Sequence, residues 1–116
     1  MTLLIADDNV RMRETLRRLL THHFTTDITI HECADGLDAV ASAQMYHPDW
    51  ILMDIKMEHL DGLAAAKAIL LTTPQSKIII VTSYDEPEFR EEAEKIGVTG
   101  YVLKDNLFSL LDIFRE

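Results

Sequence analysis

The chain has 116 residues, 47% of them hydrophobic and 27% charged, which predicts one globular domain over residues 1–116. Its formal net charge of −9 argues against direct nucleic-acid binding, because contacts to phosphates need clustered cations. Cys33 is the one cysteine, so no intrachain disulfide can form. The first apolar run is too short for a signal peptide or a membrane span. We therefore expect a cytoplasmic protein with no membrane partner.

Short apolar runs alternate with segments of helical periodicity along the chain. In order, strands are predicted at residues 3–6, 28–33, 50–53, 78–81 and 101–103, and helices at 10–24, 35–46, 62–71, 86–96 and 106–114. Most of the strands are nearly continuous apolar runs, as in parallel sheets covered on both faces, whereas 28–33 alternates and suits an edge strand. Five such units are too few for an eight-stranded barrel, so the pattern predicts an open, doubly wound α/β sheet.

Reactive polar residues follow four of the predicted strands. They are Asp7 and Asp8 after the first strand, Asp54 after the third, Thr82 after the fourth and Lys104 after the fifth. Since the carboxyl ends of parallel strands lie side by side and form the ligand crevice, we expect these side chains to share one pocket. Three carboxylates, a hydroxyl and an ammonium indicate a metal-assisted phosphate site.

Asp7 and Asp8 have two interpretations when they are considered alone. A single Asp before a helix is usually an N-cap. Two carboxylates about 4 Å apart repel each other by roughly 4 kcal/mol at a surface-like dielectric, and a divalent cation offsets that repulsion. Mg²⁺ favours one or two carboxylates together with phosphate and water. The pair alone does not decide between the cap and the metal site.

Asp54 is available for chemistry because Asp61, directly before Gly62, can cap the next helix. A carboxylate beside a cation can attack phosphorus and form an aspartyl-phosphate. The hydroxyl of Thr82 can donate a hydrogen bond to a phosphoryl oxygen, and Lys104 supplies a compact positive charge for the same group.

Together these residues resemble the signature of the receiver domains of bacterial two-component response regulators. The resemblance is carried by D-D after the first apolar run, L-M-D-I-K-M-E-H-L-D-G at 52–62, V-T-S at 81–83 and G-Y-V-L-K at 100–104. It covers essentially the whole chain, in order and with family-like spacing. It implies a flavodoxin-like, doubly wound (βα)5 fold with a five-stranded parallel sheet of order 2-1-3-4-5.

The resemblance also implies a role for each residue of the pocket. Asp54 would be the phosphoacceptor, and Thr82 and Lys104 would hold the phosphoryl oxygens. The expected ligands of Mg²⁺ (or Mn²⁺) are Asp8, Asp54 and the backbone carbonyl of Lys56, with Asp7 acting through water.

Three further residues are expected to govern switching and its timing. Tyr101 resembles the switch aromatic of the family, which turns inward when Thr82 is drawn toward the phosphate. Lys56 and Tyr84 lie two residues beyond Asp54 and Thr82. We expect Lys56 and Tyr84 to tune the lifetime of the phosphorylated state by hindering the attacking water.

Two positions depart from the commonest family pattern. Glu58 replaces the usual proline after Met57, and Asp105 replaces the usual proline after Lys104. The first change is expected to loosen the loop past Asp54, because proline fixes φ and removes a donor. The second removes a frequent candidate for a cis peptide bond. The Lys-Asp pair resembles receivers that are joined to helix-turn-helix DNA-binding domains.

The implied function is a phosphorylation-switched signalling domain and not a metabolic enzyme. Its phosphoryl group would come from a sensor histidine kinase or a phosphotransfer protein. Contact with DNA, and hence transcription regulation, would require an effector domain outside these residues. The sequence does not settle whether phosphorylation produces a homodimer.

Other function classes fit less well. An aspartyl-phosphate phosphohydrolase would usually have a second acid two residues after the nucleophile, where this chain has Lys56. A flavin or nucleotide carrier is disfavoured because D-D-N in the first strand–helix turn offers no glycine-rich or hydroxyl-rich cradle and repels phosphate without a metal. A phosphate-independent interaction module of receiver fold is disfavoured by the intact set of pocket residues.

Overall fold

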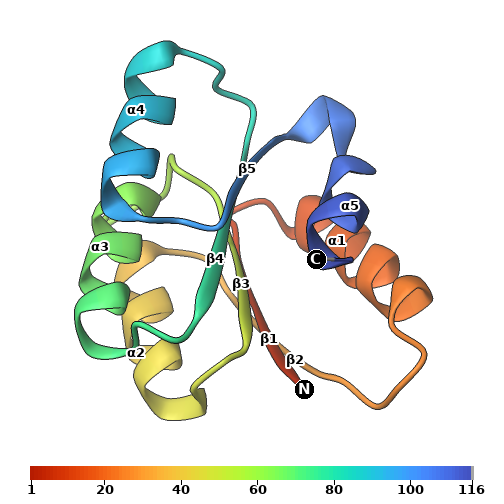
Figure 1. Cartoon of the computed structure of the whole chain (residues 1–116). Helices are drawn as coiled ribbons and strands as arrows, with labels where there is room; N and C mark the ends of the chain where they lie inside the picture. The colour runs from red at the N-terminus through yellow and green to blue at the C-terminus, as the bar shows by residue number, and fades with distance from the viewer. Residues whose placement is uncertain (116) are drawn as a thin grey trace.

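Parallel strands and helices alternate along the chain and form one sheet with helices on both faces (Figure 1). The structure is a computed structural model and describes residues 1–115. The elements are β1 (Thr2–Ala6), α1 (Val10–His23), β2 (Thr29–Cys33), α2 (Gly36–Tyr46), β3 (Trp50–Met53), α3 (Gly62–Thr72), β4 (Lys77–Thr82), α4 (Pro87–Ile96), β5 (Gly100–Leu103), the 3₁₀ turn η1 (Lys104–Asn106) and α5 (Ser109–Phe114). The strand order β2-β1-β3-β4-β5, with parallel pairing throughout, confirms the predicted doubly wound α/β fold.

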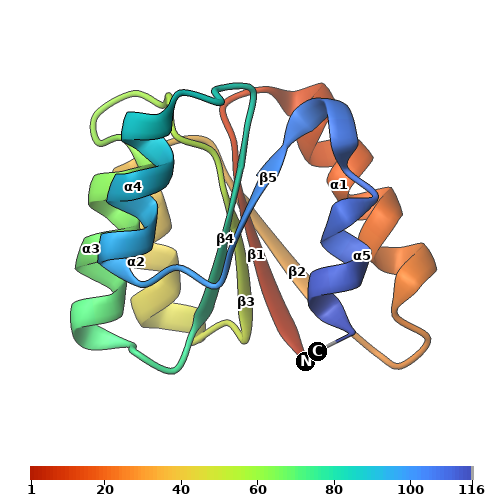
Figure 2. The ribbon, with the colours of Figure 1, turned by 45° about the horizontal axis from the view of Figure 1, so that its top comes forward.

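Two layers of helices cover the sheet. Helices α2, α3 and α4 lie on one face, and α1 and α5 lie on the other (Figures 1 and 2). Successive side chains of a strand point to opposite faces, so β1 sends Leu4 and Ala6 into the first layer and Leu3 and Ile5 into the second. Both sets are buried, which explains why the central strands are apolar at nearly every position.

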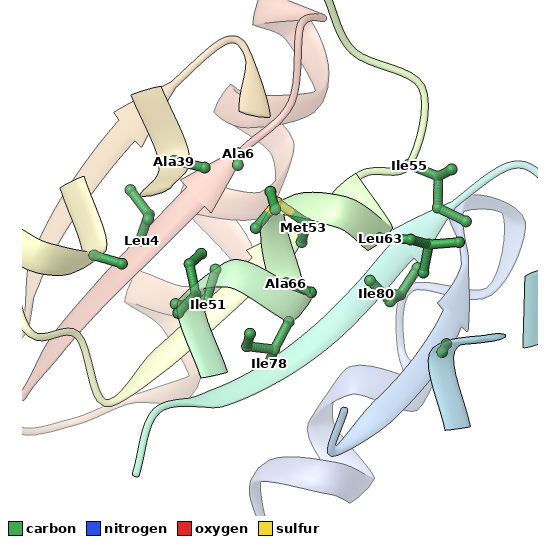
Figure 3. Packing of buried hydrophobic residues seen from close by; sticks show 14 residues of the cluster. Leu4, Ala6, Ala39, Ile51, Met53, Ile55, Leu63, Ala66, Ile78 and Ile80 are labelled. Carbon is green, nitrogen blue, oxygen red and sulfur yellow. The ribbon is translucent and has the colours of Figure 1, made fainter. Parts of the chain in front are cut away.

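The three central strands are held firmly by this packing. Figure 3 shows Ile51 of β3 and Ile78 and Ile80 of β4 among side chains of the helices that cover them. All three isoleucines are 0% exposed, and complete burial of an isoleucine contributes about 1.5–3 kcal/mol. The carboxyl ends of β1, β3 and β4 are therefore a rigid base for the residues that follow them.

The edge-strand prediction for residues 28–33 is confirmed, because β2 is the outermost strand beside β1. Its side chains are partly or fully exposed, in contrast to those of β3. One neighbouring strand and partial solvent exposure account for the alternating pattern in this segment.

The last helix differs from its predicted start at residue 106. After β5 the chain first forms η1, and α5 begins at Ser109. The residue before α5, Phe108, cannot act as a side-chain cap, and the Leu110 and Leu111 amides bond three residues back, to Leu107 and Phe108. This bonding is the tighter 3₁₀ pattern. The other elements begin and end within one residue of the predictions, and none of the helices in residues 1–115 has the length and apolarity needed to cross a bilayer.

Candidate functional site

The predicted pocket forms where β1, β3 and β4 end next to one another. Ala6 of β1 lies beside Met53 of β3, and Met53 lies beside Ile80 of β4. The two acidic residues that follow are tied to neighbouring strands: the Asp54 amide donates to the Ala6 carbonyl at 2.9 Å, and the Asp7 amide donates to the Cys33 carbonyl at 3.1 Å. The sheet therefore fixes the backbone of both acids.

Lys104 brings the fifth strand into the same pocket. Its Nζ lies 2.9 Å from Asp7 Oδ2 and 3.2 Å from Asp54 Oδ2. Asp7 is 1% exposed and Asp54 is 5% exposed, so both carboxylates are nearly removed from water. Buried charges are costly unless they are paired, and one ammonium shared by two carboxylates leaves the pocket with an acidic excess.

The electrostatics of the pocket follow from this burial. Burial raises the pKa of Asp54, the negative charge of Asp7 raises it further, and Lys104 acts in the opposite direction. Burial alone would lower the pKa of Lys104, but the hydrogen bond to Asp7 and the charges of both carboxylates raise it above its ordinary value. Lys104 is therefore a permanent cation at neutral pH, and a further cation in the pocket would favour ionised Asp54.

The acidic residues of the pocket form a cluster suited to a metal ion. One carboxylate oxygen from each of Asp7, Asp8 and Asp54 lies within 4.8 Å of the others. Asp7 and Asp54 are buried, whereas Asp8 is exposed, so the cluster opens toward solvent on the Asp8 side. Three hard oxygen donors opposed by one ammonium fit Mg²⁺ or Mn²⁺ by donor chemistry and charge.

The alternative that Asp7 or Asp8 caps α1 is wrong. The N-cap is Asn9, whose Oδ1 accepts from the Arg11 and Met12 amides at 2.9 and 3.1 Å. Asp7 Oδ1 instead accepts from the Asn9 amide at 2.9 Å and so orders the turn that leads into the helix. Because Asn9 satisfies the helix end, Asp8 remains available for a cation.

Asp54 is likewise not used as a helix cap. Asp61 caps α3, as predicted, by accepting from the Ala64 amide at 2.9 Å. Asp54 Oδ1 accepts from the Ile55 amide at 2.8 Å, and its Oδ2 faces Lys104. Contacts at both oxygens therefore fix the orientation of the Asp54 carboxylate.

Gly62 supports Asp54 and was not singled out from the sequence. A Cβ at this position would lie 1.7 Å from the Asp54 carbonyl oxygen, so no side chain fits. The Gly62 amide also donates to the Ile55 carbonyl at 2.8 Å, which closes the loop over the strand end. The available signal was a glycine at the first residue of a predicted helix, since glycine has a low helix propensity.

Thr82 is the last residue of β4 and is completely buried. Its Oγ1 accepts from the Tyr84 amide at 3.2 Å. The hydroxyl proton remains to be donated, so Thr82 can respond to a negatively charged group at the adjacent end of β3.

Tyr101 is connected to the loop that follows Thr82. The Tyr101 hydroxyl donates to the Tyr84 carbonyl at 2.6 Å. The Arg90 guanidinium lies 4.5 Å from the centre of the Tyr101 ring, and Arg90 Nε also pairs with Asp85 at 2.6 Å. Burial raises the pKa of Tyr101, with Arg90 opposing this shift, so the phenol keeps its proton and acts as a donor at neutral pH.

The loop beyond Asp54 has its own internal bonds. The Leu60 amide donates to the Glu58 carbonyl at 2.7 Å, and His59 adopts a left-handed φ of 68°. His59 Nδ1 lies 3.0 Å from Asp35 Oδ2 at the N-cap of α2. These contacts restrain the segment in which Glu58 replaces a proline; the loosening expected from that replacement stays a prediction.

Comparison with known proteins identifies a matching family and related proteins. The family described as the response regulator receiver domain matches residues 3–113. An uncharacterized transcriptional regulatory protein of Bacillus subtilis, YxjL, is 40% identical over 113 residues, which are 96% of this chain and 51% of that protein. The oxygen regulatory protein NreC of Staphylococcus aureus is 32% identical over 106 residues, 90% of this chain and 48% of NreC.

Solved structures agree with these relatives. A DNA-binding response regulator of the LuxR family from Staphylococcus aureus superposes with a TM-score of 0.87 at 30% identity, covering 98% of this chain and 95% of that chain. The signal receiver domain of the putative response regulator NarL from Mycobacterium tuberculosis gives 0.85 at 25% identity, with 98% and 95% covered. The chain spans about half the length of the curated relatives it matches.

Proposed function

The chain belongs to the family of response regulator receiver domains, and from this premise we propose that Asp54 accepts the phosphoryl group that switches it. The observation that carries the proposal is the position of Asp54, buried at the end of β3 and 3.2 Å from Lys104 Nζ, beside the carboxylates of Asp7 and Asp8. A buried carboxylate next to a fixed cation is a nucleophile beside a positive charge that offsets part of the charge of the phosphorylated product.

The proposed reaction is transfer from a phosphohistidine of a sensor histidine kinase or phosphotransfer protein. An oxygen of Asp54 forms the new bond to phosphorus, and the bond from phosphorus to the donor nitrogen breaks with its electron pair leaving on the imidazole. Lys104 and the Thr82 hydroxyl then hold the phosphoryl oxygens. The domain assists this transfer and the later loss of phosphate, but its product is a changed conformation and not a metabolite.

The pocket is also proposed to hold Mg²⁺, for which Mn²⁺ can substitute. Asp8, Asp54 and the backbone carbonyl of Lys56 would hold the ion, with Asp7 contacting it through water. When bound, the ion supplies positive charge that offsets both the clustered carboxylates and the phosphoryl oxygens. The support is the acidic excess of the pocket, in which Lys104 opposes three carboxylates.

Switching is proposed to run from Thr82 to Tyr101 through Tyr84. Phosphorylation adds about −1.5 to −2 charge, which draws the Thr82 hydroxyl toward Asp54. That movement changes the bond between the Tyr84 amide and Thr82, and the Tyr84 carbonyl is the acceptor for Tyr101. A charge placed on Asp54 therefore biases the positions of Tyr101 and α4, which act as an element with two arrangements.

The output is proposed to reside in an effector outside this domain. The relatives are transcriptional regulators of about twice the length, so we infer a DNA-binding half, whereas the receiver itself, with a net charge of −9, makes no contact with DNA. A cytoplasmic location and dimerisation on phosphorylation also belong to this proposal.

One experiment tests the phosphoacceptor. The protein is incubated with Mg²⁺ and a small acyl-phosphate donor, and its intact mass is measured. We expect the mass of one phosphoryl group to be added to the parent and not to Asp54→Asn. No added mass, or an equal gain in Asp54→Asn, would overturn the proposal.

A further inference from the structure

The side chain of Lys56 joins two loops at the rim of the pocket. Its Nζ lies 5.2 Å from the centre of the Phe89 ring and 5.5 Å from that of Tyr84. The two rings meet edge to face, with centres 5.8 Å apart and planes at 66°. An ammonium within about 6 Å of an aromatic face is attracted by its quadrupole. We call these three residues the Lys56 cage.

Two residues of the cage follow residues of the proposed phosphorylation site closely along the chain. Lys56 is two residues past Asp54, and Tyr84 is two residues past Thr82. Strands β3 and β4 are neighbours, with Met53 beside Ile80, and Lys56 and Tyr84 lie on the two loops that leave these strands. Within residues 1–115, Lys56 forms no ion pair, and the two rings are its cation–π partners.

Phe89 is the fixed wall of the cage. It is partly buried in the first turn of α4 and packs against the hydrophobic cluster beneath that helix. Lys56 and Tyr84 are both exposed, with Tyr84 at 37%. An exposed lysine loses side-chain entropy when it is held in one place. The position of Lys56 therefore depends on Phe89, whose own position is already fixed by packing on the core.

We propose that Phe89 is a positioning residue for the phosphorylation chemistry: it holds Lys56 against Tyr84 and so restricts access of water to phosphorylated Asp54. This role rests on the proposed function of Asp54. In hydrolysis, the water oxygen attacks phosphorus, the bond from phosphorus to the Asp54 oxygen breaks, and its electron pair returns to the carboxylate. The water protons go to the released phosphate and to bulk solvent. Opening the cage exposes phosphorus to that attack.

The first test measures the decay of the phosphorylated full chain in Mg²⁺ by intact mass after removal of the donor. Phe89→Leu keeps the apolar anchor but removes the ring, and we expect decay about two- to fivefold faster, as for the loss of one exposed cation–π contact. Phe89→Tyr keeps the ring and should decay like the parent. In a Lys56→Ala background, which already decays faster, Phe89→Leu should have no further effect.

Additive effects of Phe89→Leu and Lys56→Ala on the decay rate would overturn the role of Phe89 while leaving the phosphoacceptor intact. Failure of the parent to gain phosphoryl mass, or an equal gain in Asp54→Asn, would instead overturn the proposed function and this role together. The two failures are therefore distinguishable from the same mass spectra.

A second test needs neither phosphate nor metal. The melting temperatures of the parent, Phe89→Leu, Lys56→Ala and the double variant are compared in metal-free buffer. A coupled pair gives shifts that do not add, because either change alone already breaks the contact. Additive shifts would show that Phe89 and Lys56 do not hold each other, and would overturn the inference.

Discussion

Lys104 Nζ lies 3.2 Å from Asp54 Oδ2, so a residue 50 positions later in the chain supplies the counter-charge of the proposed phosphoacceptor. The Lys104 side chain is 17% exposed and the Asp54 side chain 6%. Little water therefore screens the pair, and the ammonium matters both to the chemistry and to the free energy of unfolding.

Removal of the Lys104 ammonium is expected to destabilise the metal-free protein at neutral pH. Lys104→Met leaves two buried carboxylates without a cation, and breaking a buried pair costs about 3–5 kcal/mol, reduced here by partial exposure to about 1–3 kcal/mol. Urea unfolding measures the change, with exposed Lys67→Met on α3 as the matched control. Equal stability of the two variants would contradict the importance of the ion pairs.

The raised pKa of Asp54 predicts that ionisation of this carboxyl lowers the free energy of unfolding of the metal-free protein. The folded-state pKa is above the ordinary value of 3.8, so the folded state binds the proton more tightly than the unfolded state. Protonated Asp54 therefore favours the folded state, and this stabilisation is lost as pH rises from the ordinary pKa through the raised folded-state pKa. Asp54→Asn should be more stable than the parent at neutral pH, and the difference should disappear on acidification below the ordinary value. Unfolding curves collected across this range measure it, and a difference that does not depend on pH would refute the assignment.

Asp8 is expected to control metal affinity without controlling the metal-free fold. It is the exposed member of the acidic cluster, and Asn9 already caps α1. An ion that binds only the folded state adds about 2.7 kcal/mol at 100 times its Kd, so Mg²⁺ should raise the melting temperature of the parent. Asp8→Asn should lose most of this rise, whereas Asp27→Asn, which changes an exposed acid outside the cluster, should retain it. A full Mg²⁺ response in Asp8→Asn would remove Asp8 from the proposed ligands.

The hydroxyl of Tyr101 is expected to stabilise the loop before α4. Tyr101→Phe keeps the ring beneath Arg90 but removes the 2.6 Å bond to the Tyr84 carbonyl, and we expect a loss of about 0.5–1.5 kcal/mol in unfolding free energy. Tyr46→Phe is the control, because the Tyr46 ring stacks on His31 and its hydroxyl has no hydrogen-bond partner among the described residues. If both variants unfold alike, the Tyr101 bond does not contribute.

The architecture and most of the pocket could be predicted because both depend on patterns along the chain. Buried parallel strands require continuous apolar runs, and their carboxyl ends must meet, so Asp7, Asp54 and Lys104 were expected in one place. Their actual pairing depends on side-chain reach between the ends of β1, β3 and β5, which the sequence does not contain. The sharing of Lys104 between Asp7 and Asp54 became visible only in the structure.

Local details were harder to predict, for reasons that the structure makes clear. Three successive polar residues could each cap α1, and the choice of Asn9 depends on where the chain turns. Gly62 is needed because its loop packs on the Asp54 carbonyl, a contact with no sequence pattern of its own. The late start of α5 reflects a 3₁₀ turn, whose i to i+3 bonding scarcely alters the apolar periodicity of the segment.

Phe89 and Arg90 are adjacent in the first turn of α4, and one faces Lys56 while the other faces Tyr101. On the proposed mechanism, any protein that binds this turn and shifts it must alter both the exposure of phosphorylated Asp54 and the position of Tyr101, the proposed switch residue. Binding free energies are reciprocal, so a partner that prefers the phosphorylated form also stabilises that form. A partner that binds α4 would therefore help to set the lifetime of the phosphorylated form.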